Sequence, residues 1–194
     1  MSRPAPTEHP VHTLIARRHS PYALDPQREI SQADLEAVFE AARWSASSYN
    51  AQPWRYIVGV KGRSQGVWDR IFSVLLEGNQ PWARNAPVLA LGLVQHQFEH
   101  NGKTNKAAEH DLGAASANLS IEATARGLVV HQMIGIDPDK AREVFAIDAG
   151  LEAFTGLAIA YPGTPDVVPD KYAQRDAGTR RRKPLDELLI AGNF

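Results

Sequence analysis

Two short basic segments near opposite ends of the chain carry the side chains best suited to bind a phosphate group. The first is Arg17-Arg18-His19-Ser20, and the second is Arg180-Arg181-Arg182-Lys183. Guanidinium groups bind phosphate monoesters through paired, charge-assisted hydrogen bonds, and a serine hydroxyl adds a further donor. Each segment alone is equally consistent with a solvated basic surface. The two together suggest an anion site, provided that the fold brings the chain ends together.

A polar loop, Ser47 to Trp54, is a second candidate, because short hydrogen-bonding side chains crowd directly before an apolar segment. Ser47, Asn50 and Gln52 are its donors and acceptors. An ordinary turn explains this composition as well as a ligand contact does. Gly135, which follows an apolar run ending at Ile134, carries no functional signal by itself.

The segment His96-Gln97-Phe98-Glu99-His100 spells H-x-x-E-H, the inverted pattern of some zinc peptidases. That chemistry requires a helix, so that both histidines face one metal beside a glutamate base. The segment instead leaves an apolar strand and enters Asn101-Gly102, a turn signal. We therefore favour a chance match. His131 lies in an apolar run, which favours a core histidine.

Composition narrows the protein class. The 194 residues suit one domain, 1–194, and the formal net charge of −1 gives little support for a nucleic-acid or membrane surface. Four consecutive basic residues at 180–183 without interleaved aromatics make a weak nucleic-acid site. Because the chain has no cysteine, disulfides, thiolate metal sites and cysteine nucleophiles are excluded. No segment resembles a signal peptide or a membrane span, so we expect a cytoplasmic protein.

The segment that must position these residues is a long helix over Asn105–Arg126. Polar and apolar residues alternate along part of it, as in a strand, but the run is too long for a strand and rich in alanine. Wound as a helix, it presents small or apolar residues on almost every side and should be buried. Gly127 ends it, and a strand over Leu128–Ile134 follows.

The remaining pattern alternates helices with strands and predicts an α/β or α+β fold, a central mixed sheet flanked by helices. We expect helices over Val11–Arg18, Ser31–Trp44, Val67–Leu76, Asp137–Phe145 and Leu185–Ile190, and strands over Trp54–Val60, Val88–Val94 and Phe154–Tyr161. The segments 79–87, 96–104 and 162–179 should be irregular.

In this order the motifs resemble those of the nitroreductase family of flavin enzymes, over roughly residues 11 to 190. That family has a first helix ending in Arg-x-Ser, a Ser-x-x-Asn-x-Gln-Pro-Trp loop, an Ala-Pro-Val strand entry, an Asp-x-Gly-x-Ala-x-x-Asn-Leu helix ending in Gly-Leu, and a basic segment before Pro-Leu. The matching segments are Arg18-His19-Ser20, Ser47–Trp54, Ala86-Pro87-Val88, Asp111–Leu128 and Arg180–Leu185.

The resemblance implies an NAD(P)H-dependent FMN oxidoreductase that works as a homodimer with two FMN sites at the subunit interface. It assigns the FMN phosphate and ribityl chain to Arg18, His19, Ser20, Arg180 and Arg182. Ser47, Asn50 and Gln52 would contact the ring edge and ribityl hydroxyls, from the same or the partner subunit. Asn79 would bind the pyrimidine side of the ring, and the amide near Ile134-Gly135 would point at flavin N5. The long helix would form the dimer core.

It also implies hydride transfer through flavin N5 to a small organic acceptor, such as a nitroaromatic, quinone or enone, by a ping-pong mechanism. No side chain is then needed as base or nucleophile. The alternatives are a flavin-holding protein without turnover and the zinc peptidase of His96, Glu99 and His100. Two departures matter: Tyr22 stands where the family usually has Arg or Lys two residues after the serine, and the 96–104 connection is short where many members carry a lid.

Overall fold

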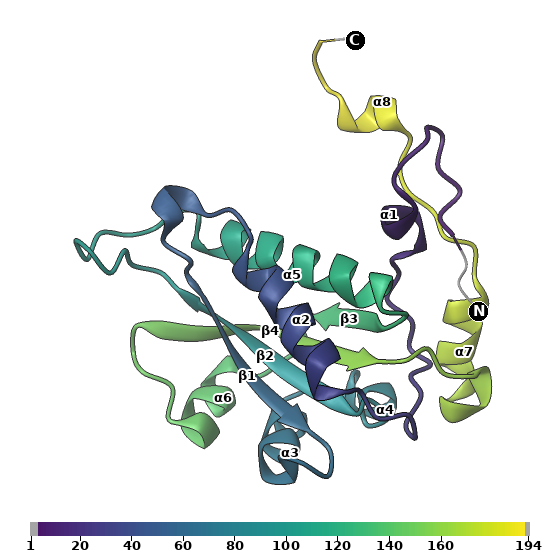
Figure 1. Cartoon of the computed structure of the whole chain (residues 1–194), viewed down its shortest axis with the longest axis horizontal. Helices are drawn as coiled ribbons and strands as arrows, with labels where there is room; N and C mark the ends of the chain where they lie inside the picture. Colours follow the sequence, from purple (N-terminus) through teal and green to yellow (C-terminus); the bar gives the residue numbers. More distant parts are fainter. Residues whose placement is uncertain (1–3, 193–194) are drawn as a thin grey trace.

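The computed structural model describes residues 4–192 and has a four-stranded sheet with helices on both faces (Figure 1). The strands are β1 (Trp54–Val60), β2 (Val88–Gln95), β3 (Val129–Met133) and β4 (Leu151–Ala160). The helices are α1 (Thr13–Arg17), α2 (Gln32–Arg43), α3 (Gln65–Ser73), α4 (Gln80–Ala83), α5 (Ala108–Ala125), α6 (Pro138–Phe145), α7 (Asp170–Ala177) and α8 (Leu185–Leu188), with short 3₁₀ turns η1 (Ser48–Asn50) and η2 (Pro165–Val167). The α+β class is confirmed.

The sheet has the order β1-β2-β4-β3, and each of its three strand pairs is antiparallel. The expected mixed sheet is therefore wrong for this part of the chain. The reason lies in β2, whose residues are almost all buried: a strand covered on both faces is apolar throughout, as in parallel sheets, whatever its direction. β3 is an edge strand, so one side of it lies open to neighbouring groups.

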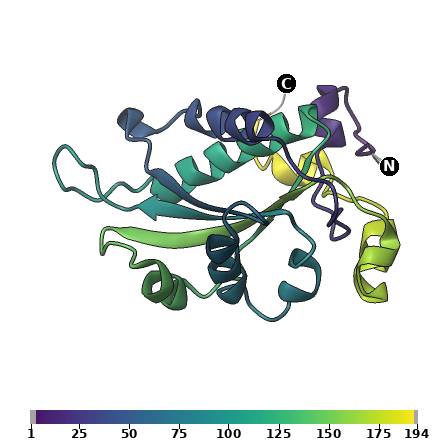
Figure 2. The same cartoon turned by 60° about the horizontal axis from the view of Figure 1, so that its bottom comes forward.

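Helices α2 and α5 cover one face of the sheet, and α3, α4 and α6 lie on the other (Figure 2). Two apolar clusters result. One contains Val38, Leu119 and Ile159 between the sheet and the first helix layer. The other contains Ile71, Trp82 and Leu91 on the opposite face. The edge strand β3 contributes to both clusters, Val130 to the first and Met133 to the second.

The long helix is confirmed as α5, shorter than predicted by three residues at its start and one at its end. Its buried residues recur with helical spacing along one stripe, through Leu112, Ser116 and Leu119 to Ala123. The other side, which includes Gly113 and Ala117, is exposed in the single chain. The prediction of a helix buried on nearly every side is thus not met by one chain alone.

Local signals set most of the element ends. Ser31 caps α2 by accepting the amide of Asp34 at 3.0 Å, and Asp137 caps α6 by accepting that of Lys140 at 2.9 Å. Gly127 ends α5 with φ +74°, the left-handed conformation that favours glycine. Two helices, α4 and α7, occupy segments predicted as irregular. Within residues 4–192 no helix is both long and apolar enough to span a bilayer.

The segment after α7, residues 178–192, extends from the body as an arm and lies beside the N-terminal segment that contains α1 (Figure 1). Arg180 makes this connection, because its Nη1 donates to the carbonyl of Ala16 at 2.8 Å and its Nη2 to that of Arg18 at 2.7 Å. Beyond it Leu188 at the end of α8 and Ile190 just after that helix are exposed, at 61% and 94% accessible. The fold therefore joins the two basic segments identified in the sequence.

Candidate functional site

Three guanidinium groups gather where α1 meets the C-terminal arm: Arg18, Arg180 and Arg182, here called the arginine cluster. Burial lowers the pKa of Arg18, and the charge of Arg182 lowers it further. Burial likewise lowers the pKa of Arg180, with smaller contributions from Arg18 and Arg182. These shifts mean that the positive charges repel one another in a partly desolvated place. A bound anion would relieve that repulsion.

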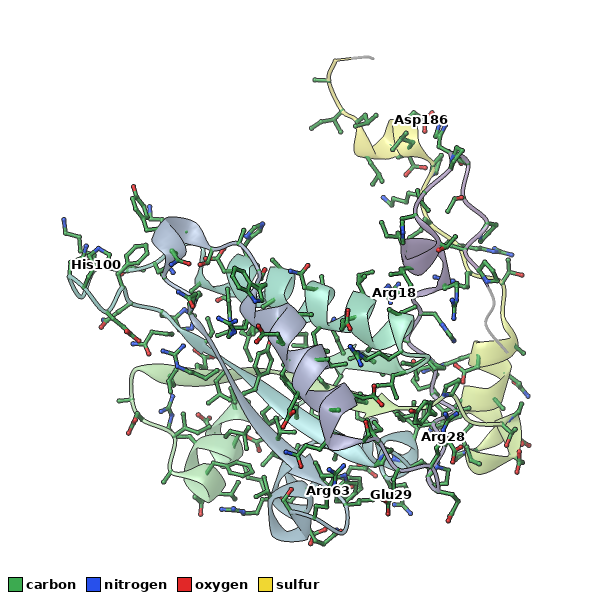
Figure 3. All side chains as sticks on the ribbon, in the orientation of Figure 1. Arg18, Arg28, Glu29, Arg63, His100 and Asp186 are labelled. Carbon is green, nitrogen blue, oxygen red and sulfur yellow. The ribbon has the colours of Figure 1, made fainter. Side chains whose placement is uncertain are left out.

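Two cavities adjoin the arginine cluster, and all three arginines line both. One, of about 560 Å³, lies between the segment 178–182, the segment 18–21 and α7. The other, of about 470 Å³, lies between the N-terminal segment and the arm and is lined partly by the apolar Val11, Ile15 and Leu188. Both volumes fall in the range of ligand pockets. Figure 3 shows Arg18 beside the arm, where the two chain ends meet.

Ser20 and His19 continue the cluster toward the edge strand. Ser20 Oγ donates to the carbonyl of Val130 at 3.2 Å and lies 3.4 Å from Nη1 of Arg18. His19 Nδ1 lies 3.1 Å from the carbonyl of Arg17. The pKa of His19 is lowered, chiefly by burial, so this ring is neutral near pH 7. Ser20 therefore fixes the cluster at the start of β3.

Asn79, Ile134 and Gly135 form a second group at the other end of β3. Asn79 Nδ2 donates to the carbonyl of Gly135 at 2.9 Å, and the amide of Leu76 donates to the same oxygen at 3.0 Å. A Cβ on Gly135 would lie 2.4 Å from Asn79 Nδ2, so a side chain at this position would displace the Asn79 amide. Ile134 is 67% exposed at the same corner. The five residue steps from Val130 to Gly135 span about 16 Å of extended chain, which is the distance along β3 between this group and Ser20.

The 47–52 loop, which carries Ser47, Asn50 and Gln52, is backbone-strained. Tyr49, Asn50 and Gln52 have φ of +52°, +54° and +47°, a region that costs non-glycine residues energy. Side-chain bonds hold this conformation: Ser47 Oγ accepts the amide of Gln52 at 3.0 Å, and Asp111 accepts that of Ser48 at 3.0 Å. Strain of this kind clusters at ligand-binding loops. Tyr49 is 87% exposed.

The structure does not bring the 47–52 loop to the arginine cluster within one chain. The loop is fixed to Asp111 at the start of α5, whereas Ser20 is fixed to Val130 just beyond its end. The helix between Asp111 and Arg126 is about 22 Å long. The predicted site residues thus form two groups at the two ends of α5 (Figure 1). At one end lie Arg18, His19, Ser20, Arg180 and Arg182, and from there β3 leads back along α5 to Asn79, Ile134 and Gly135. The other end holds Ser47, Asn50 and Gln52.

The H-x-x-E-H segment is a hairpin rather than a helix, because the amide of Phe98 bonds the carbonyl of Lys103 at 2.9 Å. His96 Nε2 lies 3.0 Å from the Glu152 carboxylate, and Glu99 pairs with Arg55 at 2.9 Å. In the described part of the chain no three histidine or acidic side chains converge as a metal site. This geometry removes the support for the zinc peptidase alternative. His100 lies at the far end of the hairpin (Figure 3).

A group of aromatic rings beside the arginine cluster was not predicted from the sequence. Tyr22 packs against Trp82, His131 and Tyr172, with ring centroids 4.8 to 5.4 Å apart. His131 Nδ1 lies 3.0 Å from the carbonyl of Pro21, and burial lowers the pKa of this histidine. It is the core histidine that the sequence favoured. Arg175 on α7 lines the larger cavity and was also missed.

Comparison with known proteins identifies relatives of this chain. The sequence model of the nitroreductase family matches residues 15–77. A solved structure named as an oxidoreductase containing FMN is 31% identical, has a TM-score of 0.89, and aligns over 98% of this chain and 96% of its own. The chain belongs to the nitroreductase family. The residues that carried the resemblance therefore pointed to the correct family.

Two further nitroreductase-like proteins show how far the similarity extends. The major NAD(P)H-flavin oxidoreductase of Aliivibrio fischeri is 27% identical over 79% of this chain and 88% of its own length. A nitroreductase family protein from Clostridium difficile, 22% identical with a TM-score of 0.68, aligns over 90% of this chain and 94% of its own. The second comparison supports the fold alone, which it shares with this nitroreductase-family chain.

Proposed function

We propose that this chain is an FMN-dependent oxidoreductase that uses NAD(P)H to reduce a small organic acceptor. The observation that carries the proposal is the arginine cluster at one end of the edge strand β3, with the close approach of Gly135 and Asn79 at the other. FMN has one terminal phosphate and a flat ring, joined by a polyhydroxyl chain. Two relatives of this chain, one named as containing FMN and one named as an NAD(P)H-flavin oxidoreductase, support the same cofactor.

The residues present fit FMN in their chemistry. Arg18 and Arg182 supply guanidinium donors for a phosphate, and neither makes an ion pair with another of residues 4–192. Arg180 already bonds two carbonyls, so its main task is to hold the arm in place. At the other end of β3 the Asn79 amide lies against Gly135, whose missing Cβ permits this approach, and the two would offer polar groups to the edge of the flavin ring.

In the proposed mechanism bound FMN would supply the hydride chemistry between NAD(P)H and the acceptor. The side chains then bind and orient. Arg18 and Arg182 hold the phosphate, Ser20 keeps the cluster against β3, and Asn79 keeps the Gly135 corner closed. Since both substrates would use one place beside the ring in turn, ping-pong kinetics follow. The acceptor class, whether nitroaromatic, quinone or enone, stays a prediction.

We also propose a homodimer of one-domain chains, with residues 1–194 forming the FMN-binding domain. The exposed Gly113 and Ala117 on α5 allow close approach of a second helix, and the apolar Leu188 and Ile190 of the arm need cover. A two-fold related chain would bring its own 47–52 loop toward this chain's arginine cluster. This arrangement would reunite the two groups of predicted site residues. The cytoplasmic location stays a prediction.

The test begins with the purified protein incubated with FMN and desalted. We expect retained yellow absorbance, an increase in melting temperature and a light-scattering mass twice the 21.3 kDa of the chain. Addition of NAD(P)H without oxygen should bleach the flavin, and an acceptor should restore its colour. A protein that retains no FMN contradicts the proposal. A protein that keeps FMN but does not bleach would instead be the flavin-holding protein without turnover.

A further inference from the structure

Arg175 on α7 supplies an additional positive charge to the larger cavity. Its guanidinium carbon lies 5.8 Å from the ring centroids of both Tyr22 and Tyr172, and its Nη1 lies 3.5 Å from the Tyr22 hydroxyl. Contacts of this kind restrict an exposed arginine to one region of space. Arg175 lines the cavity together with the arginine cluster.

The position of α7 is itself fixed. The Asp176 carboxylate accepts the amides of Tyr22 at 3.0 Å and Ala23 at 2.8 Å, and the Tyr172 hydroxyl donates to the carbonyl of Gly78 at 2.8 Å. The helix therefore docks against the segment that follows Ser20. Arg175 is held over Tyr22, the residue at which this chain lacks the Arg or Lys usual two positions after the serine. The positive charge that position 22 lacks is thus provided by Arg175 on α7.

Charge and volume both exceed what FMN phosphate needs. Four guanidinium groups line the cavity, from Arg18, Arg175, Arg180 and Arg182, against one carboxylate, Asp176, which also accepts two backbone amides. A phosphate monoester carries a charge of about −2. Arg18 and Arg182, which are not bonded to backbone carbonyls of the other segment as Arg180 is, would match one such group. Arg175, exposed and lining the same cavity of about 560 Å³, is then available for a second.

We propose that Arg175 binds the 2′-phosphate of NADPH, so that this protein uses NADPH in preference to NADH. The proposal rests on the proposed function. About 16 Å of β3 separates Gly135, where the nicotinamide would meet the flavin, from Ser20 in the cavity wall, so the adenosine end of the dinucleotide could extend to Arg175. There a monoester dianion is the strongest partner for a guanidinium fork, stronger than the singly charged groups of the pyrophosphate. NADH lacks this group.

The test compares Arg175→Ala and Arg175→Lys with the matched control Lys171→Ala. Lys171 lies on the same helix, is exposed, and has its ammonium 4.8 Å from the ring centroid of Tyr172, but it does not line the cavity. Both alanine variants remove one positive charge from α7. Adenosine 2′,5′-bisphosphate and adenosine 5′-monophosphate, which differ in the 2′-phosphate alone, are titrated by calorimetry into each FMN-loaded protein.

For Arg175→Ala we expect affinity for the bisphosphate to fall about tenfold, the lower end for losing a charge-assisted hydrogen bond because the site is exposed. Affinity for the monophosphate and for FMN should change less than about twofold. The KM for NADPH should rise in proportion, with kcat and the KM for NADH nearly constant. Arg175→Lys keeps the positive charge but loses the paired guanidinium donors, so its affinity for the bisphosphate should lie between those of Arg175→Ala and the unmodified protein. Lys171→Ala should resemble the unmodified protein throughout.

Three results would overturn the assignment. Equal weakening of both nucleotides would place Arg175 at a part of the ligand that they share. A weaker affinity for FMN with unchanged nucleotide binding would make Arg175 an FMN ligand. Equal affinity of the unmodified protein for the two nucleotides would mean that no 2′-phosphate site exists. In these cases FMN binding itself persists, whereas an unmodified protein that holds no FMN overturns the proposed function as well.

Discussion

Arg55 and Glu99 join the strained 47–52 loop to the hairpin that follows β2. Arg55 Nη2 lies 2.9 Å from the Glu99 carboxylate, while Nη1 donates to the carbonyls of Gln52 at 2.9 Å and Trp54 at 2.8 Å. The rings of Tyr49 and Phe98 meet edge to face at 5.8 Å beside this contact. The loop and the hairpin are therefore held together at Arg55. This arginine makes two hydrogen bonds to backbone carbonyls and one ion pair, so we expect the hydrogen bonds to be its larger contribution.

Because only Arg55 also bonds the backbone, replacing Arg55 and replacing Glu99 should have different effects. Both side chains of the ion pair are about half exposed or more, so the pair contributes at most about 1 kcal/mol to folding. Glu99→Ala, like His96→Ala, should leave activity and FMN affinity nearly unchanged. Arg55→Ala also removes two bonds to backbone carbonyls, one of them that of Gln52 in the loop, and hydrogen exchange at the amides of 48–52 should become faster. Equal exchange in Arg55→Ala and Glu99→Ala would show that Arg55 does not hold the loop.

Arg18 and Arg17 form a matched pair for testing the arginine cluster. They are neighbours of equal charge, but Arg17 lines neither cavity. Arg18→Ala should lower FMN affinity roughly tenfold to a hundredfold, the loss of a charge-assisted bond of about 1.5–3 kcal/mol. Excess FMN should restore most of the turnover. Arg182→Ala should behave in the same way.

The control is Arg17→Ala, which should bind FMN within about twofold of the unmodified protein when titrated by flavin fluorescence. If Arg17→Ala and Arg18→Ala lowered the affinity for FMN equally, the effect would be one of general surface charge. If neither did, the phosphate would bind elsewhere.

Stability should fall in mild acid because of His131. Burial lowers the pKa of this histidine below its ordinary value in the folded state, with smaller opposing effects of the Pro21 carbonyl and of Asp176. The unfolded chain therefore binds a proton more readily than the folded one. The contribution of neutral His131 is complete above the ordinary histidine pKa of about 6.5 and is lost as the pH falls from there through the lower folded-state pKa.

Melting temperatures at pH 7.5 and 5.5 test this assignment. His131→Gln should be less stable at pH 7.5, since it loses ring packing against Trp82 at 4.2 Å, but its further loss on acidification should be smaller than that of the unmodified protein. His12→Gln, which changes an exposed histidine, is the control and should retain the full acid sensitivity. An unchanged pH dependence in His131→Gln would assign the effect to another group. His19, whose pKa is also lowered, would be examined next.

The sequence predicted the elements with regular signals and missed those without them. β1 was predicted with its observed bounds, Trp54–Val60, because β-branched and aromatic residues fill it. α7 was missed because only Tyr172 of its eight residues is buried, so it has no apolar periodicity. Strand direction was wrong because an apolar run such as β2 does not encode it. For the site, residue types indicated a phosphate group, but the contacts of Arg180 with α1 and of Arg175 with Tyr22 arise from tertiary structure.

The proposed dimer predicts that each FMN site combines Arg18 of one chain with Asn50 of the other. Asn50→Gly removes the amide side chain while tolerating φ +54°, so the loop should keep its backbone. Arg18→Ala and Asn50→Gly should each weaken FMN binding as homodimers. A heterodimer of the two variants, purified through different tags, has one site with both residues intact and one with neither. It should bind half an equivalent of FMN per chain with the affinity of the unmodified protein. If Asn50 acted within its own chain, every site would lack one residue and no tight binding would return.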